Sequence, residues 1–194
     1  MPVFLNATDP NFEAEFQTLL SAKREDSPDV DQVVADIIAD VRARGDAALL
    51  EYTERFDRLS LTSETLRLSG AEIAAEIQKV APEDRAALEL AADRIRAYHA
   101  EQMPQDAWWK DASGAELGWR WTPVSAAGLY VPGGLATYPS SVLMNAIPAK
   151  VAGVERLAIT VPTPGGAINP LVILAAELAG VDEIFRLGGE QAIA

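Results

Sequence analysis

Apolar side chains recur every three or four positions along the first hundred residues, which is the period of a helix with one buried face. The pattern predicts five helices, and a short run with Leu66 and Leu68 between the third and the fourth is compatible with a strand. The apolar positions of the five helices are Phe12, Phe16, Leu19 and Leu20; Val30, Val33, Val34, Ile37, Ile38 and Val41; Leu49, Tyr52 and Phe56; a stretch from about Ala71 to Val80; and Leu88, Ala91, Ala92, Ile95 and His99.

Residues with known preferences for helix ends separate these segments. Ser27 can cap the second helix, and Pro28 suits its first turn because proline lacks the amide hydrogen that this turn leaves unpaired. Gly45 is expected to end that helix and Asp46 to cap the next. Pro82 is expected to open the fifth and longest helix.

The pattern changes to alternation between Trp108 and Pro123. Leu117, Trp119 and Trp121 share one face, and a Ser113-Gly114 turn precedes them, so the segment is predicted to be a β-hairpin. All four tryptophans of the chain lie here. Aromatic residues at alternate strand positions usually pack in a core or an interface, and we favour that role over stacking on a ligand.

Strands and helices alternate from Ala126 onward. Strands are predicted at 127–131, 157–161 and 184–187, with helices at about 139–152 and 169–178 between them. Right-handed crossovers of this kind make a parallel sheet. The first of these helices is apolar almost all round, so we expect it to be buried between the sheet and another layer, with a bend at Pro148.

The predicted fold class is therefore α/β, with a helical N-terminal region followed by a partial parallel-sheet, Rossmann-like domain. Composition shifts near Pro123, so we place residues 1–123, including the hairpin, in the first unit and residues 124–194 in the second.

Composition excludes several classes of function. A formal net charge of −13 argues against nucleic acid or an anionic membrane surface as partner, because both are bound by clusters of lysine and arginine. The chain has no cysteine, which excludes disulfides, thiolate metal sites and a cysteine nucleophile. The first residues do not resemble a signal peptide and no apolar run reaches membrane-spanning length, so the expected location is the cytoplasm.

Three predicted strands end in glycine-rich or proline-rich turns, at 132–134, 162–166 and 188–189. Ligands of doubly wound sheets lie beyond the carboxyl ends of the strands, so these turns could line one crevice, although each could also be a plain turn. None matches the G-x-G-x-x-G fingerprint of ordinary dinucleotide sites. Tyr130 and Gln191 fall at this edge, where they could bind a cofactor or simply pack at a rim.

Two further residues are assigned no binding role. Glu190 would repel a cofactor phosphate, so its side chain is expected to point away from the crevice. His99 is the only histidine, and one histidine without neighbouring ligands does not make a zinc site. We expect His99 to pack at a helix surface.

Two longer strings carry a family resemblance. GLYVPGG at residues 128–134, continued to Lys150, and GGEQAIA at residues 188–194 resemble motifs of histidinol dehydrogenases, and the resemblance extends over essentially the whole chain. It implies a homodimeric, cytoplasmic enzyme that oxidises L-histidinol to L-histidine with NAD and a zinc ion. It also implies two related α/β domains with an architecture like that of aldehyde dehydrogenases.

The resemblance assigns NAD-binding roles to Tyr130 and Gln191, and more weakly to Pro132 and Pro162. The family's catalytic Glu-His pair and its zinc ligands lie beyond the second motif, so no catalytic or metal-binding residue is assigned in this chain. We therefore expect a truncated chain that is inactive alone and exposes an apolar face or sheet edge. A stand-alone nucleotide-binding or interaction module, and a purely helical scaffold, are the alternatives.

Overall fold

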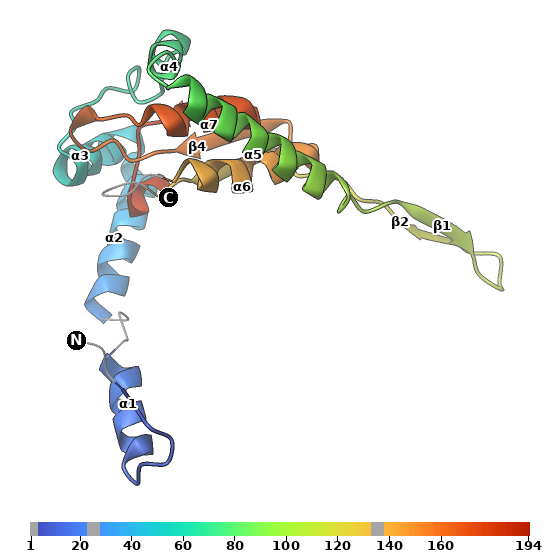
Figure 1. Ribbon diagram of the computed structural model, residues 1–194, viewed down its shortest axis with the longest axis horizontal. Coiled ribbons are helices and arrows are strands. Elements are labelled where there is room, and N and C mark those ends of the chain that lie inside the picture. The colour runs from blue at the N-terminus through green and yellow to red at the C-terminus, as the bar shows by residue number, and fades with distance from the viewer. Residues whose placement is uncertain (1–3, 23–27, 133–137) are drawn as a thin grey trace.

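The computed structural model describes residues 4–22, 28–132 and 138–194 (Figure 1). Its helices are α1 (Phe12–Ala22), α2 (Pro28–Arg44), α3 (Asp46–Asp57), α4 (Gly70–Ile77), α5 (Pro82–Ala100), α6 (Pro139–Val151) and α7 (Pro170–Ala179). Its strands are β1 (Ala107–Lys110), β2 (Glu116–Trp119), β3 (Ala126–Tyr130), β4 (Arg156–Thr160) and β5 (Glu183–Phe185), and two short 3₁₀ turns are η1 (Pro164–Gly166) and η2 (Glu190–Ala192). Ser27, Gly133 and Gly134 lie outside the described residues.

Strands β3, β4 and β5 form the parallel sheet that the sequence predicted, in the order β3-β4-β5. Ala127 pairs with Leu157, and Ile159 pairs with Ile184. Each strand begins one residue earlier than predicted and ends one or two residues earlier. The alternating strand and helix pattern was sufficient to predict a parallel sheet, because the connecting helices α6 and α7 are long enough to return the chain to the same end of the sheet.

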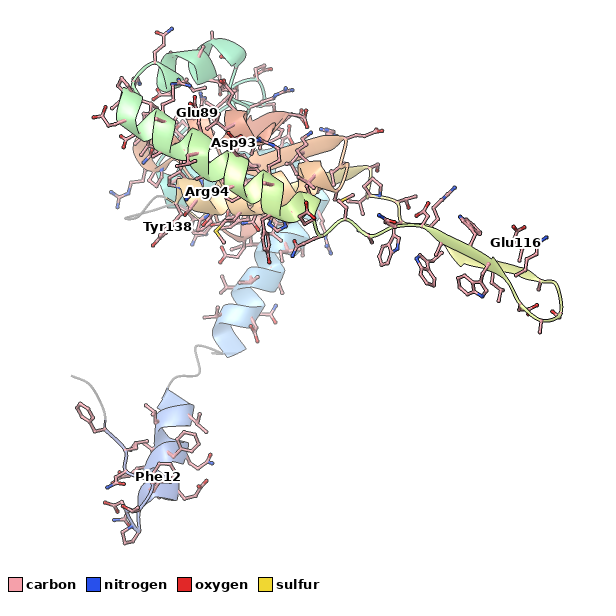
Figure 2. All side chains as sticks on the ribbon, turned by 45° about the vertical axis from the view of Figure 1, so that its right-hand side comes forward. Phe12, Glu89, Asp93, Arg94, Glu116 and Tyr138 are labelled. Atoms are coloured by element: carbon pink, nitrogen blue, oxygen red, sulfur yellow. The ribbon has the colours of Figure 1, made fainter. Side chains whose placement is uncertain are left out.

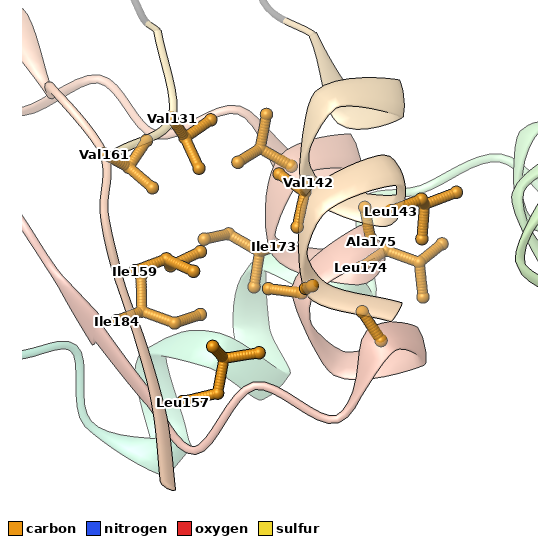
Figure 3. Packing of buried hydrophobic residues seen from close by; sticks show 14 of the residues in the cluster. Val131, Val142, Leu143, Leu157, Ile159, Val161, Ile173, Leu174, Ala175 and Ile184 are labelled. Carbon is orange, nitrogen blue, oxygen red and sulfur yellow. The ribbon is translucent and has the colours of Figure 1, made fainter. Parts of the chain in front are cut away.

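The core lies between one face of this sheet and helices α6 and α7 (Figure 3). Leu157, Ile159 and Ile173 are fully buried at its centre. Helix α5 contacts both α6 and α7, so α6 is enclosed between the sheet and an outer helix as expected. The enclosure is incomplete, however, because Met144 on α6 is 63% exposed.

The Leu66–Leu68 segment, which the sequence analysis described as compatible with a strand, pairs with the free side of β5. The Leu68 amide donates to the Ile184 carbonyl at 2.9 Å, and the Arg186 amide donates to the Leu66 carbonyl at 2.9 Å. Helix α4 follows with a capping box, in which Ser69 and Glu72 satisfy each other's backbone amides. Both leucines are buried.

The predicted ends of α2 are confirmed, and one predicted cap is wrong. Helix α2 begins at Pro28 and ends before Gly45, which has φ +58° and so adopts a conformation that glycine tolerates best. Asp46 does not cap α3. It lies inside the first turn, where its carboxylate accepts a hydrogen bond from the Ser63 hydroxyl at 2.9 Å and still favours the helix dipole.

The hairpin formed by β1 and β2 is antiparallel and projects away from the rest of the molecule (Figures 1 and 2). Its tryptophans are not part of the described core, since Trp108, Trp109, Trp119 and Trp121 are all between 45% and 64% exposed. Trp109 and Trp119 instead contact each other edge to face, with ring centroids 5.2 Å apart.

The division of the chain at residue 123 stays a prediction. The core cluster includes Leu68, Ile77 and Ala92 from the first part together with residues of the sheet and its helices. None of the described helices combines the length and the apolar character needed to cross a bilayer.

Candidate functional site

The carboxyl ends of β3, β4 and β5 lie at one edge of the sheet, because the strands are parallel. Pairing of β4 with β5 extends one residue further, where the Val161 amide donates to the Phe185 carbonyl at 2.9 Å. A β-carbon added at Gly188 would lie 2.7 Å from Cγ of Pro162, so these two residues pack directly against each other. The absence of a side chain at Gly188 therefore lets the turns after β4 and β5 converge.

Tyr130 lines a hollow at this edge. The hollow has a volume of about 230 Å³ and is bordered by Tyr130, Thr160, Ala192 and Ile193, with Gly128, Leu129 and Ala158 on the strands below. Tyr130 is 41% exposed, and its ring is accessible from solvent. The structure thus brings the end of β3 and residues of and after the turn η2 to one hollow.

Gln191 does not line this hollow. Its side chain is only 2% exposed, and neither atom of its amide has a hydrogen-bond partner in the structure. A β-carbon at Gly189 would lie 2.6 Å from Oε1 of Gln191, so the amide packs against the glycine turn. A buried amide normally pairs both its donor and its acceptor, so this unpaired amide is an exception.

The two prolines of the predicted site differ in exposure. Pro162 is half-buried against Gly188, whereas Pro132 is exposed directly after the buried Val131. Gly133 and Gly134 lie outside the described residues, so the contribution of that turn stays a prediction. Glu190 is exposed, and the expectation that it points away from the crevice stays a prediction.

Charged pairs stabilise the opposite, amino-terminal edge of the sheet. Arg156 and Glu183 form an ion pair of 2.6 Å, and Lys150 pairs with Asp182 at 2.7 Å. The hydrogen bond from Lys150, assisted by the Leu157 amide, lowers the pKa of Asp182. These groups hold the strands together and do not face the candidate site.

Two polar residues near the site were not singled out from the sequence. Thr163 follows Pro162 and is 2% exposed, and its hydroxyl has no hydrogen-bond partner. Asp57 ends α3, and one of its carboxylate oxygens is buried without a partner. Burial raises the pKa of Asp57. Thr163 belongs to the turn at 162–166 that the sequence analysis identified, but its burial depends on tertiary packing. No local sequence pattern distinguishes Asp57.

The residues present do not fit a zinc ion. Within the ranges that the structure describes, no three histidine, aspartate or glutamate side chains are grouped so as to hold a metal. The ring Nδ1 of His99 lies 2.6 Å from Oε1 of Gln102, which places it in a local contact near the end of α5.

Comparison with known proteins identifies relatives over the full length of the chain. The family model described as histidinol dehydrogenase matches residues 20–194. Histidinol dehydrogenases of Cereibacter sphaeroides and Ruegeria pomeroyi are 72% and 71% identical over all 194 residues, which span 45% of each relative. The crystal structure of histidinol dehydrogenase from Elizabethkingia anophelis superposes with a TM-score of 0.81 at 34% identity, over 87% of this chain and 39% of that one.

Proposed function

Because this chain belongs to the histidinol dehydrogenase family, we propose that it forms the NAD-binding part of an enzyme that oxidises L-histidinol to L-histidine. The observation that carries the proposal is Gln191, whose buried amide has neither its donor nor its acceptor paired beside the Gly188-Gly189 turn. Such a group at the carboxyl edge of a parallel sheet is suited to a bound dinucleotide.

The residues at this edge fit parts of NAD, which accepts hydride from the substrate when bound. The accessible ring of Tyr130 offers an aromatic face and a hydroxyl to the cofactor. Gln191 offers an amide donor and a carbonyl acceptor, and Pro132 and Pro162 supply apolar surface. The work of these residues is to bind and orient the cofactor.

The remaining chemistry belongs to a part of the relatives that this chain does not span. Removing the proton of an alcohol requires a general base within hydrogen-bond reach. We place the Glu-His pair and the zinc ligands in that remaining part, so this chain alone is expected to be inactive. The hollow of about 230 Å³ is also smaller than typical ligand sites, which agrees with a site completed by further residues.

The proposal includes the larger assembly implied by the resemblance. It comprises two related α/β domains arranged as in aldehyde dehydrogenases, a homodimer, and a cytoplasmic location. A cysteine-free, acidic chain is compatible with that location.

Replacing Tyr130 by alanine in the complete enzyme tests the proposal. We expect Tyr130→Ala to weaken NAD binding by about 1–3 kcal/mol, which is roughly 5- to 150-fold in Kd, because a stacking or hydrogen-bonding contact is lost. NAD affinity is measured by calorimetric titration. Tyr98→Ala is the matched control, since Tyr98 is 64% exposed on α5, away from the strand ends.

Equal NAD affinity in Tyr130→Ala and Tyr98→Ala would contradict the assignment of Tyr130. Protein-dependent formation of NADH by the 194-residue chain, given histidinol, zinc and NAD, would show that the chemistry does not require the remaining part. Nucleotide binding without any oxidation of histidinol by the complete protein would favour a binding module instead.

A further inference from the structure

A second hollow lies where the hairpin leaves the body of the molecule, after the end of α5 (Figure 1). Its volume is about 180 Å³, below the roughly 300 Å³ at which small-molecule sites begin, so it is suited to one side chain. It precedes β3, whereas the candidate cofactor site lies at the other end of that strand. Residues that border it include Met103, Pro104, Asp106, Trp121, Pro123 and Ala152, and none of its described border residues is basic.

Contacts between the two chain segments at the base of the hairpin fix the walls of this hollow. Oδ1 of Asp106 accepts a hydrogen bond from the backbone amide of Trp121 at 2.8 Å. A β-carbon at Gly153 would lie 3.3 Å from Cγ of Pro123, so the proline packs against the backbone that follows α6. The carboxylate of Asp106 is therefore held beside the segment that carries Trp121.

Two helices end at the hollow. Ala152 is the C-terminal cap of α6, and Met103 lies three residues after the end of α5. The carboxyl end of a helix carries a partial negative charge. Lys150, in the last turn of α6, is already paired with Asp182 at 2.7 Å. The two helix ends and the carboxylate of Asp106 therefore favour a cation in the hollow.

The apolar part of the wall selects among cations. Trp121 is 60% exposed and Met103 is 45% exposed, so an aromatic face and a thioether are accessible. A guanidinium group can stack on an indole and donate two hydrogen bonds to a carboxylate at the same time. An ammonium group is compact and strongly hydrated, and it lacks this planar geometry. The chemistry of the hollow thus favours arginine over lysine.

We propose that this hollow binds the side chain of an arginine that a partner polypeptide carries between apolar residues. The apolar neighbours of the arginine are expected to pack on the hairpin. The exposed indole of Trp119 lies directly beside the hollow, because its Nε1 donates to the carbonyl of Gln105 at 3.0 Å, one residue before Asp106. The net charge of −13 also attracts a basic partner.

The test is a titration of the 194-residue chain with a blocked peptide that has one arginine between two leucines. The reference peptide has citrulline in place of arginine, which keeps the shape of the side chain and removes its charge. Nuclear magnetic resonance of the tryptophan indole signals measures the Kd, and Trp121→Leu identifies the signal of that indole. The arginine peptide is expected to bind more tightly than the citrulline peptide, and added salt should reduce the difference.

Three variants locate the binding site on the chain. Asp106→Asn should raise the Kd for the arginine peptide about threefold, because asparagine keeps an acceptor for the Trp121 amide but loses the charge. Trp121→Leu should also raise it about threefold, since the stacking surface is lost. Asp84→Asn is the control, because it removes the same charge from the first turn of α5, at the other end of that helix. Circular dichroism verifies that the variants are folded.

Each alternative occupant gives a different result. Equal affinity for the two peptides, or an unchanged Kd in both Asp106→Asn and Trp121→Leu, would overturn the arginine site. Blocked arginine alone, bound as tightly as the peptide, would replace the polypeptide partner by a free small cation. A Trp121 signal that moves with protein concentration alone would replace it by a second copy of the chain. Failure of the complete enzyme to bind the peptide would mean that its remaining part fills the hollow.

Discussion

At the scale of single residues, the candidate site depends on glycines, because the absence of a side chain lets neighbouring groups pack against their backbone. Gly188 allows Pro162 to approach, and Gly189 allows the Gln191 amide to pack against the backbone. Gly189 also has φ +61° and ψ −165°, a conformation that residues with a β-carbon rarely adopt. Conformation and space thus both require glycine at Gly189.

Gly189→Ala is expected to cost about 1–3 kcal/mol of stability and also to weaken NAD binding, because the new methyl group displaces Gln191. Gly165→Ala is the control, since Gly165 has φ +61° but open space where a β-carbon would be added. Thermal unfolding and NAD titration distinguish the two. Equal NAD affinities in both variants would mean that the position of Gln191 does not matter for the cofactor.

At the scale of elements, the hairpin is stabilised by a close cross-strand contact. Gly118 pairs with Trp108, and a β-carbon at Gly118 would lie 2.4 Å from the Trp108 ring. The indole therefore covers the glycine and replaces the side-chain contact that the strand lacks. The hairpin extends away from the core, so such local contacts account for much of its order (Figure 2).

Gly118→Val should disrupt this hairpin although valine favours strands, because the side chain and the indole cannot occupy the same space. We expect loss of the edge-to-face contact between Trp109 and Trp119, seen as a changed near-ultraviolet circular dichroism spectrum. Glu116→Val, at an exposed position on the same strand, is the control. An unchanged tryptophan spectrum in Gly118→Val would show that the ring can move away at little cost.

Helix α4 provides a second test at this scale, because Glu72 links its cap to the sheet. The carboxylate accepts from the Ser69 amide at 2.9 Å and from its hydroxyl at 2.7 Å, and also pairs with Arg186. The Ser69 amide is the main cause of the lowered pKa of Glu72. Because the pKa of Glu72 is lower in the folded state, its ionised carboxylate stabilises the fold. This stabilisation is complete above the pKa of Glu72 in the unfolded chain and is lost as pH falls through its pKa in the folded chain.

Glu72→Gln should therefore lower the midpoint of thermal unfolding at pH 7 and have a smaller effect near pH 3. Ser69→Ala, which removes the same cap, is expected to cost about 1 kcal/mol. Unfolding curves recorded between pH 7 and pH 3 check both. The same difference between the wild type and Glu72→Gln at every pH would exclude a role for the charge.

At the scale of the whole molecule, one face of the parallel sheet is open. Helices α6 and α7 cover the face that carries Leu157 and Ile159, whereas Gly128 and Tyr130 on the other face are exposed. Parallel sheets are nearly always covered on both faces. Apart from Tyr130, the strand positions that line the hollow on this face carry small side chains, Gly128, Ala158 and Thr160, so another polypeptide surface could pack closely against it.

We expect the 194-residue chain to form dimers or small oligomers through this face. Ala158→Glu, at the centre of the open face, should shift the population towards monomer, whereas Ala115→Glu in the hairpin loop should not. Light scattering at several concentrations measures the association, and circular dichroism verifies that the variants are folded. A wild-type chain that stays monomeric at high concentration would contradict the expectation.

The amino-acid sequence by itself determined the elements and their order. Helical spacing, the Pro28 and Gly45 boundaries and the alternation around Leu117 were sufficient because these signals act between neighbouring residues. The repeated strand and helix pattern also determined the parallel sheet. Placement of Tyr130 at the sheet edge followed, since a strand ends there.

Only the tertiary structure decided where α3 begins, whether the tryptophans are covered, and which polar groups lose contact with water. Asp46 was predicted as a cap, but the chain enters α3 one residue earlier. The tryptophans were expected in a core or an interface; all four are exposed in this chain, which rules out the core, and an interface stays a prediction. The burial of Thr163, of Gln191 and of one carboxylate oxygen of Asp57 depends on tertiary packing, and the segments α3, η1 and η2 that contact one another there are far apart in sequence. Such desolvation arises from distant surfaces closing over a group, and no local pattern records it.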